Sequence, residues 1–304
     1  MKNILITGCN GFVGSSLTNH YLNKGAMVLG IDLAENSIID NKNFYYVQKD
    51  LTKDSLKEIF SRVSIDLFIH CAGNANVSVS VENPKLDFDS NVIALNNILL
   101  TLKEANQKCK FIFLSSAAVY GNPSQLPIKE EDFISPISPY GLHKAICEDI
   151  CKYFRKINCM DIYILRIFSA YGVGLKKQLF WDMFVKYKTI GKLDLFGTGK
   201  ETRDFINIKD IVNAIDLIAS NNNKYYVYNI SNGVEVSIEE IAKIFANNLT
   251  DKPIVTFSKK NKQGDPLKWR GDISRLKDIG YEQSIDIESG IVEYIKWANE
   301  VWDE

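Results

Sequence analysis

The stretch that decides the fold is Gly8-Cys9-Asn10-Gly11-Phe12-Val13-Gly14. It follows the apolar run 3–7, which is typical of a buried parallel strand, and precedes a helical pattern through Leu17, Tyr21 and Leu22. In this context a glycine loop lets the backbone approach a pyrophosphate, and the helix start offers free N–H groups. A tight turn without a ligand is the alternative. We expect a dinucleotide cofactor to contact Gly8, Asn10, Gly11, Phe12, Val13 and Gly14.

The next apolar segments supply further candidate cofactor contacts. The second predicted strand ends on Asp32, whose carboxylate can accept hydrogen bonds from a ribose and would repel a 2′-phosphate. NAD is therefore favoured over NADP, and an ordinary strand-end aspartate is the alternative. After the third strand, Asp50 and Leu51 could border the adenine. The fourth strand, within 66–73, ends in small residues across which a cofactor could lie flat, namely Cys71, Ala72 and Gly73.

Strands and helices alternate up to residue 168, which predicts a doubly wound parallel α/β sheet. Ligands bind beyond the carboxyl ends of such strands, so Ser116, after the fifth strand, lies where substrate chemistry would occur. It could instead be a structural cap. Tyr140 and Lys144 share one helix face, so the ammonium could lower the pKa of the phenol and make it a base. A surface turn without chemistry is the alternative.

Beyond Phe168 the alternation breaks, and we expect a smaller C-terminal α/β lobe for the substrate. Arg203 and nearby lysines could bind a substrate phosphate, or form only a solvated charge run. No linker marks a boundary, so the chain should cross between lobes more than once. The expected division is a cofactor domain of residues 1–168 plus about 204–230, and a substrate lobe of about 169–203 plus 231–304.

Composition limits the classes of function. The 304 residues are 46% hydrophobic with a net charge of -1, which suits a globular protein and gives no general attraction to nucleic acid or an anionic membrane. The six cysteines form no Cys-x-x-Cys pair, so no metal site is expected and a reducing, cytoplasmic location is suggested. Cys147 and Cys151 share a helix face and are expected to be buried thiols. His70 is expected to be structural. Neither a signal peptide nor a membrane span is expected.

Several motifs in one order resemble the extended short-chain dehydrogenase/reductases that act on nucleotide sugars, a Rossmann-fold family that includes UDP-glucose 4-epimerase. The resemblance covers nearly the whole chain. Its motifs are Thr7-Gly8-x-x-Gly11-Phe12-x-Gly14, His70-x-Ala72-Gly73, Asn91, Ser115-Ser116-x-x-Val119-Tyr120-Gly121, Pro139-Tyr140-x-x-x-Lys144, Arg166-x-Phe168, Thr202-Arg203-Asp204-Phe205 and Tyr228-Asn229-Ile230.

This resemblance implies a catalytic triad of Ser116, Tyr140 and Lys144. Tyr140 would take the proton of a sugar hydroxyl, most naturally at C4, while hydride passes to the nicotinamide. Lys144 would hold the nicotinamide ribose and lower the pKa of Tyr140, and Ser116 would hold the reacting oxygen. The implied cofactor contacts also include Asn91, Ser115, Tyr140 and Lys144. The implied substrate contacts are Asn74, Ser116, Ser169, Gln178, Arg203, Lys262 and Arg270.

Some positions depart from the family pattern. The dehydratase branch places an Asp and a Glu after the catalytic Ser or Thr to drive water elimination, and this chain has Ala117 and Ala118 there, so dehydration is disfavoured. Ser169 stands where relatives often have an Asn that touches the substrate phosphate. Lys262 stands where they often have Arg. Its ammonium is a point charge, whereas the planar guanidinium of Arg can donate two parallel hydrogen bonds to a phosphate. The fit to a standard UDP-hexose site is therefore open.

Three functions remain. We favour a C4 epimerase, in which hydride returns to the same sugar and NAD is not consumed. The alternative is an NAD(P)-dependent 4-ketoreductase or 4-dehydrogenase for a nucleotide-linked hexose or heptose, and the third is a non-catalytic NAD-binding regulatory protein. Relatives often serve surface polysaccharide synthesis and dimerise through two long helices, which here would be 91–103 and 140–153. A homodimer is therefore expected.

Overall fold

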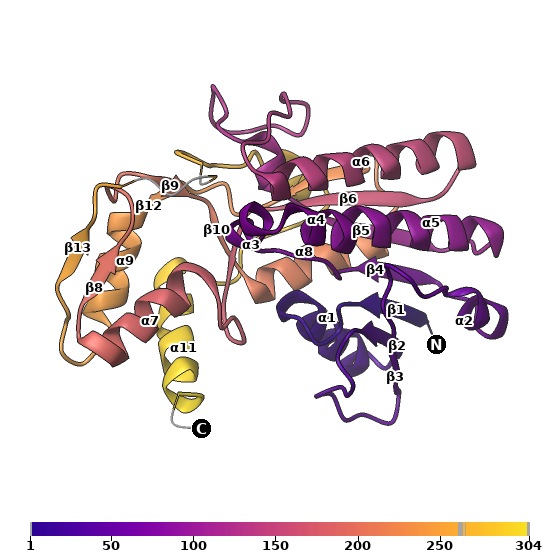
Figure 1. The fold of residues 1–304 in the computed structure, drawn as a ribbon, viewed down its shortest axis with the longest axis horizontal. Helices are drawn as coiled ribbons and strands as arrows, with labels where there is room; N and C mark the ends of the chain where they lie inside the picture. The colour runs from indigo at the N-terminus through magenta and orange to yellow at the C-terminus, as the bar shows by residue number, and fades with distance from the viewer. Residues whose placement is uncertain (1, 261–263, 265, 303–304) are drawn as a thin grey trace.

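A seven-stranded sheet with strand order β11-β6-β5-β4-β1-β2-β3 forms the centre of the computed structural model, which describes residues 2–260, 264 and 266–302 (Figure 1). Each neighbouring pair in this sheet is parallel, which confirms the doubly wound α/β fold. The strands are β1 (Asn3–Thr7), β2 (Met27–Asp32), β3 (Phe44–Gln48), β4 (Leu67–His70), β5 (Lys110–Ser116), β6 (Ile162–Ile167) and β11 (Val227–Ile230).

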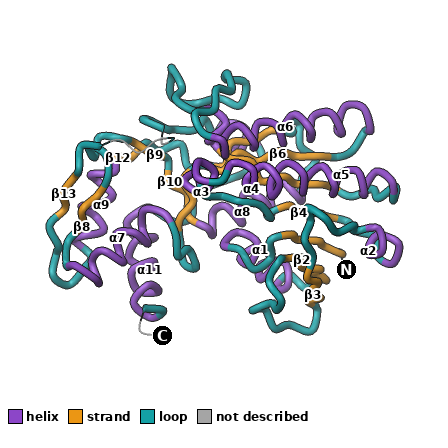
Figure 2. The backbone as a smooth tube through the Cα atoms, viewed as in Figure 1, coloured by secondary structure: helices purple, strands orange, loops and turns teal. Residues whose placement is uncertain are grey.

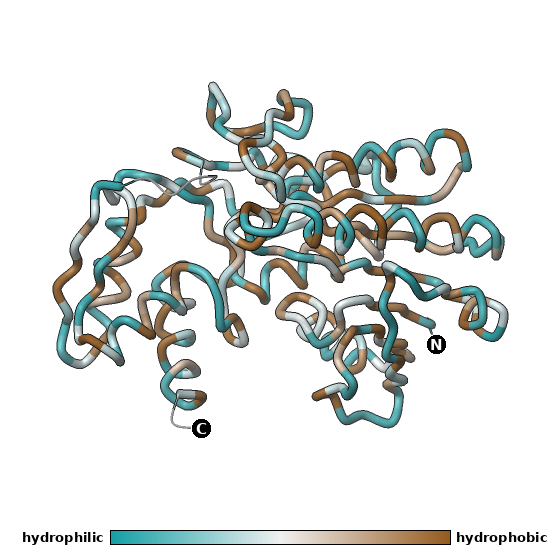
Figure 3. The backbone as a smooth tube through the Cα atoms, viewed as in Figure 1, coloured by the Kyte–Doolittle hydropathy of each residue, from teal (hydrophilic) through white to brown (hydrophobic). Residues whose placement is uncertain are grey.

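The central strands are apolar because helices cover both faces of the sheet. Ile4 and Ile6 of β1 pack on one face with α1 and α8, whereas Leu5 packs on the other face with α2, α5 and α6. Hydrophobic residues recur along these strands and along the inner sides of the helices (Figure 3). The helices are α1 (Phe12–Asn23), α8 (Ile208–Ser220), α2 (Lys57–Arg62), α5 (Ala94–Glu104) and α6 (Pro139–Asn158).

The chain between β4 and α5 is less regular than the sequence predicts. The predicted helix at 91–103 is preceded by two short helices, α3 (Val77–Glu82) and α4 (Pro84–Phe88), and begins within a π-helical turn, η1 (Asp89–Ile93). Asn83 caps α4 through a hydrogen bond from Leu86 N, and Pro84 occupies its first turn. These turns place Asn91 beside the end of β4. A short 3-10 turn, η2 (Ala117–Tyr120), follows β5.

The C-terminal part has its own hydrophobic cluster, in which Tyr171 stacks on Phe180 at 5.0 Å between ring centroids. It lies at the opposite end of the molecule from α2 and the outer strands, and loops join its short elements (Figures 1 and 2). The predicted domain boundaries remain a prediction. The elements of the C-terminal part are β7 (Ser169–Tyr171), α7 (Gln178–Ile190), β8 (Leu193–Leu195), β9 (Thr202–Arg203), β10 (Phe205–Asn207), β12 (Val236–Ser237), α9 (Ile238–Asn247), β13 (Val255–Phe257) and α11 (Ile287–Glu300). The short helix α10 (Ser274–Asp278) instead packs on β11 of the central sheet.

Among the described residues, no helix is both long enough and apolar enough to cross a bilayer.

Candidate active site

The glycine loop lies where the strand order reverses, between β1 and its two neighbours β2 and β4. Ligands bind at this switch point in open α/β sheets. Gly8 has a φ of +67°, and a Cβ there would lie 2.8 Å from the backbone nitrogen of Ala72. A Cβ on Gly14 would lie 2.0 Å from the carbonyl oxygen of Gly8. The loop therefore closes this tightly against the end of β4 only because both residues are glycines.

The first turn of α1 is open to an anion. Gly11 is its N-cap residue, and no side chain in the described part of the chain caps the helix. Helices α2, α5 and α7 also begin without a side-chain cap, whereas side chains cap α6, α8, α9 and α11. The uncapped N–H groups and the positive end of the helix dipole suit a pyrophosphate, which fits the predicted contacts of Phe12 and Val13 with the cofactor.

Asp32 and Asn10 lie next to the glycine loop, where the sequence predicts the adenosine. The Asp32 carboxylate accepts hydrogen bonds from the backbone N–H groups of Asn10, at 3.0 Å, and Leu33, at 2.8 Å. The Asn10 side chain is bonded to the loop at 36–37, so it supports that loop. Sequence reasoning missed Leu33, which is 66% exposed beside this carboxylate. Its apolar surface suits an adenine ring.

Asp50 and Leu51 follow β3 in a tight turn. The Asp50 carboxylate accepts a hydrogen bond from the Thr52 hydroxyl at 2.6 Å and pairs with Lys53 at 2.9 Å. The Thr52 hydrogen bond and Lys53 lower the pKa of Asp50 to about 2. Leu51 packs in the core on the α5 side of the sheet. The predicted contact of these residues with the adenine stays a prediction.

Cys71, Ala72 and Gly73 lie at the end of β4, where a cofactor could lie against the sheet. Asn91 is buried beside them, and its Nδ2 donates to the carbonyl oxygen of Asp87 at 3.0 Å. Its Oδ1 is buried without a hydrogen-bond partner among the described residues. A Cβ on Gly73 would lie 2.6 Å from this oxygen. An unsatisfied buried acceptor is costly, so this edge suits a donor group from a bound cofactor.

The structure brings Ser116, Tyr140 and Lys144 together at the carboxyl edge of the sheet. Ser116 ends β5, and its hydroxyl lies close enough to the Tyr140 phenol to lower the pKa of that phenol. Lys144 Nζ lies 5.9 Å from the centre of the Tyr140 ring and donates to the carbonyl oxygen of Leu114 at 3.0 Å. Ser138 caps α6 with its hydroxyl, so the helix presents Tyr140 in its first turn. A proton acceptor, a hydroxyl and an ammonium therefore meet at one point.

One electrostatic prediction is wrong for the protein alone. Lys144 was expected to lower the pKa of Tyr140, but burial raises that pKa to about 12, and the hydrogen bond with Ser116 offsets only part of the rise. Burial also lowers the pKa of Lys144. Both shifts have one cause, because each charged form loses its hydration in the interior. The phenolate and the ammonium therefore depend on each other and on any further positive charge brought by a ligand.

The predicted cofactor contact of Ser115 stays a prediction, but the structure shows where its side chain lies. Its hydroxyl donates to Glu148 Oε1 at 2.7 Å in the interior, so the side chain faces away from the cofactor site. Glu148 also accepts two hydrogen bonds from the guanidinium of Arg166, at 2.9 and 2.7 Å. Only the backbone of Ser115 remains for a cofactor contact. Its side chain instead ties the catalytic strand to α6 and β6.

The predicted substrate residues are brought together only in part. The Trp269 ring packs against Phe168, 5.9 Å between centroids, and against the Arg203 guanidinium at 5.6 Å. Ser169 follows Phe168 and Arg270 follows Trp269 in the sequence, so both residues lie near Arg203. Arg270 Nε is buried without a partner in the described part of the structure, which fits a ligand acceptor.

Three other predicted substrate residues differ from this group. Asn74 is bonded to the Asp87 carboxylate through Nδ2 at 2.5 Å. Gln178 is exposed at the start of α7, and among the described residues the structure gives it no contact with Phe168, Arg203 or Trp269. Lys262 lies outside the described residues.

His70 is structural, and Cys147 and Cys151 are buried thiols, as the sequence predicts. His70 Nδ1 lies 2.7 Å from the Thr7 hydroxyl, and burial lowers the pKa of His70 to about 3. A ring that stays neutral inside the sheet cannot shuttle protons near pH 7. Cys147 and Cys151 are buried free thiols.

Sequence reasoning missed a polar cluster behind the triad. Ser80 accepts a hydrogen bond from the Tyr140 backbone N–H at 3.1 Å, and Asp87 Oδ2 lies 2.5 Å from His143 Nδ1. The Asn83-Pro84 pair was a readable helix-start signal for the segment that carries Asp87. Nothing in the sequence pairs Asp87 with His143, because 56 residues separate them.

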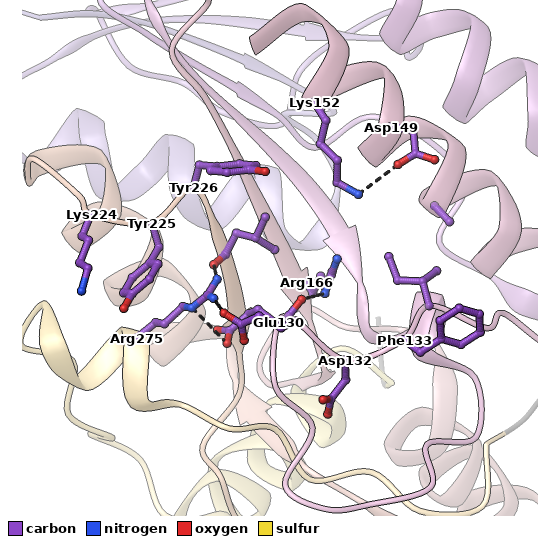
Figure 4. Close-up of a pocket in the computed structure, with 14 residues that line it drawn as sticks. Glu130, Asp132, Phe133, Asp149, Lys152, Arg166, Lys224, Tyr225, Tyr226 and Arg275 are labelled. Atoms are coloured by element: carbon purple, nitrogen blue, oxygen red, sulfur yellow. Dashed lines mark hydrogen bonds and ion pairs between the residues drawn. The ribbon is translucent and has the colours of Figure 1, made fainter. Parts of the chain in front are cut away.

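A separate pocket of about 690 Å³ lies between the loop at 130–134, α6 and the segment at 224–227 (Figure 4). Ser116, Tyr140 and Lys144 are not among the described residues that line it. Several of its charged side chains pair with one another, since Arg275 contacts Glu130 and Glu131 and Lys152 contacts Asp149. The pocket is therefore distinct from the candidate active site.

Comparison with known proteins agrees with the fold and with the predicted family. The model of the NAD dependent epimerase/dehydratase family matches residues 4–231. A putative UDP-glucose 4-epimerase of Methanocaldococcus jannaschii is 31% identical, covering 97% of each chain. A UDP-glucuronate 4-epimerase of Thermodesulfobacterium geofontis is 30% identical, covering 97% of this chain and 96% of its own. The solved UDP-N-acetylglucosamine 4-epimerase of Methanobrevibacter ruminantium is 28% identical with a TM-score of 0.89, covering 99% of both. The chain belongs to the NAD-dependent epimerase/dehydratase family.

Proposed function

We propose that this protein is an NAD-dependent UDP-sugar 4-epimerase. The observation that carries the proposal is the cluster of Ser116, Tyr140 and Lys144 at the carboxyl edge of the sheet, the same edge at which α1 begins without a side-chain cap. The relatives named above are 4-epimerases of UDP-linked sugars, which supports both the reaction and the nucleotide. The proposed cofactor domain is residues 1–168 plus about 204–230, with the rest of the chain holding the sugar nucleotide.

In this mechanism Tyr140 accepts the proton of the C4 hydroxyl at its phenol oxygen. Ser116 holds the same substrate oxygen, which keeps it within reach of the base. The Lys144 ammonium stabilises the phenolate from the neighbouring helix turn. NAD, when bound, supplies the acceptor and later the donor of the hydride. Tyr140 then returns its proton to the C4 oxygen after the keto sugar has presented its other face.

The site disfavours water elimination. Ala117 and Ala118, which follow Ser116, are buried and carry no group that can transfer a proton. Elimination of a hydroxyl needs an acid that protonates the leaving oxygen. An epimerase or a simple oxidoreductase needs no such group at these positions.

A net oxidoreductase is the second candidate, because the same three residues serve hydride transfer in one direction. The two are separated by incubating the purified protein with UDP-glucose, UDP-N-acetylglucosamine and UDP-glucuronate, together with dTDP-, GDP- and CDP-sugars. We expect the C4 epimer of a UDP-sugar by NMR, with no net change in absorbance at 340 nm. A steady change at 340 nm would contradict the epimerase, and a 4-keto-6-deoxy product would identify a dehydratase.

We further propose a cytoplasmic homodimer that pairs through α5 and α6, which lie side by side (Figure 1). Leu100, Tyr153 and Ile157 on these helices are 40%, 58% and 57% exposed, and the hollow between the helices is lined mainly by apolar side chains. Contiguous exposed apolar surface of this kind marks interfaces. Light scattering should give twice the chain mass, and Leu100→Lys with Ile157→Lys should give a monomer.

A further inference from the structure

A buried carboxylate lies beside the catalytic helix. Asp87, on α4, is 0% exposed, and its Oδ2 lies 2.5 Å from Nδ1 of His143 on α6. His143 is also buried, three residues after Tyr140 and one before Lys144. Its ring packs edge-on against Phe88, with 5.3 Å between centroids. A carboxylate removed from water is costly unless it is hydrogen-bonded, so this pair constrains how α4 and α6 can pack.

The other oxygen of this carboxylate holds the edge of the sheet after β4. Asp87 Oδ1 accepts hydrogen bonds from Nδ2 of Asn74 at 2.5 Å and from Nδ2 of Asn91 at 3.2 Å. These contacts turn the amide of Asn91 so that its Oδ1 is left without a protein donor among the described residues, beside Gly73. One side chain therefore links the helix of the catalytic tyrosine to the edge that would carry the nicotinamide.

The charge of Asp87 acts at the same place. Burial raises the pKa of Tyr140, and Asp87 adds to that rise. Burial lowers the pKa of Lys144, and Asp87 opposes that change. The carboxylate therefore favours the charged ammonium, which the proposed mechanism needs, and its effect on both groups places it within electrostatic reach of them.

We propose that Asp87 and His143 are positioning residues, which together set the distance between the catalytic helix and the cofactor edge of the sheet. This inference rests on the proposed function, because it takes NAD to lie along the end of β4. Neither side chain is assigned a contact with the substrate. Small misplacements of reacting groups lower the rate of chemistry more than they weaken binding. Loss of the link should therefore lower kcat and leave KM for the sugar nucleotide nearly unchanged.

Two substitutions of matched shape test the link. His143→Asn places an amide nitrogen near the position of Nδ1, so it can still donate to Asp87. His143→Leu has the same branching and no donor. We expect kcat to fall about tenfold or more in His143→Leu with KM changed less than about twofold, and to recover to within about threefold of wild type in His143→Asn. Equal kcat in His143→Leu and wild type, or equal loss in both variants, would overturn the proposal.

A double-substitution cycle tests whether Asp87 and His143 act as a unit. If His143 acts through Asp87, the variant Asp87→Ala/His143→Leu should have the same kcat as Asp87→Ala alone. If the two single losses of kcat multiply in the double variant, Asp87 and His143 have independent roles, which would contradict the link. His20→Leu is the control. His20, in the last turn of α1, forms a second His–Asp contact, with its Nε2 3.4 Å from Asp216 of α8. This variant should keep wild-type kcat.

Cofactor binding gives a readout that does not depend on the substrate. By calorimetry on cofactor-free protein, Asp87→Ala should bind NAD about fivefold or more weakly, since Asn91 loses its orientation, and His20→Leu should bind as wild type does. Circular dichroism checks that each variant is folded. If no nucleotide sugar turns over, the proposed function fails while this titration still decides the role of Asp87. Unchanged NAD affinity in folded Asp87→Ala would overturn that role.

Discussion

Two helices begin at the carboxyl edge of the sheet, and their first turns are built in opposite ways. The start of α1, at Gly11, has no side-chain cap within the described residues. The start of α6 is closed by Ser138, whose hydroxyl accepts a hydrogen bond from Gly141 N at 3.1 Å, and Pro139 occupies the first turn. The backbone N–H of Tyr140 is also satisfied, by Ser80.

The difference matches what each turn has to do. An uncapped turn keeps its N–H groups free for an anionic ligand, so α1 acts through its backbone. A capped turn holds its own side chains in place, so α6 acts through Tyr140 and Lys144. Substitutions at the two starts should therefore separate cofactor binding from chemistry.

The largest effect is expected at the closed turn. Tyr140→Phe removes the base but keeps the ring, so turnover should fall about a thousandfold while NAD affinity stays within about twofold. Epimer formation and calorimetric NAD titration measure the two effects. Tyr153→Phe, on the exposed side of the same helix, is the control and should keep wild-type turnover. Near-normal rates in Tyr140→Phe would mean that another group is the base.

The next largest effect is expected at the open turn. Gly14→Ala adds a Cβ that would lie 2.0 Å from the Gly8 carbonyl oxygen, so the loop must move away from the phosphate position. NAD affinity should fall about a hundredfold or more, and activity with it. Gly25→Asn is the control, because a Cβ there meets nothing within 4 Å and Asn tolerates its φ of +77°. Tight NAD binding by Gly14→Ala would show that the loop does not hold the cofactor.

A smaller effect is expected at the ribose site. Asp32→Asn removes the charge and leaves one oxygen, whereas the backbone N–H groups of Asn10 and Leu33 bond to the two different carboxylate oxygens of Asp32. NAD should bind about tenfold more weakly, and the preference over NADP should narrow, because a neutral amide no longer repels a 2′-phosphate. Parallel titrations with NAD and NADP measure both changes. An unchanged preference would assign the discrimination to other residues.

The smallest effect is expected when the closed turn is opened. Ser138→Ala removes the cap of α6 and should lower the free energy of unfolding by about 1 kcal/mol. Turnover should fall by a few fold, since Tyr140 lies two residues from the cap. Ser237→Ala removes the cap of α9 in the C-terminal part, so it should cost similar stability and leave turnover unchanged. Identical turnover in both variants would mean that the cap does not position the base.

The predictions from sequence succeeded where one local pattern carries both structure and role. The apolar run before Gly8 and the helical spacing after Gly14 predicted the β1–α1 unit, and the resemblance to a family predicted that Ser116 meets Tyr140. Features that depend on burial were beyond the sequence. The Ser115 hydroxyl bonds to Glu148, and burial raises the pKa of Tyr140, because both depend on what surrounds the side chain.

The sequence by itself determined the parallel sheet, the glycine loop and the order of the motifs, since strand and helix periodicity and backbone freedom at glycine are local properties. Only the tertiary structure decided which distant side chains meet. Asp87 reaches His143, and Arg203 reaches Trp269, across gaps of 56 and 66 residues, because α4 packs on α6 and the segment after β13 returns to β9. Such contacts arise from packing, which leaves no mark in the spacing of residues along the chain.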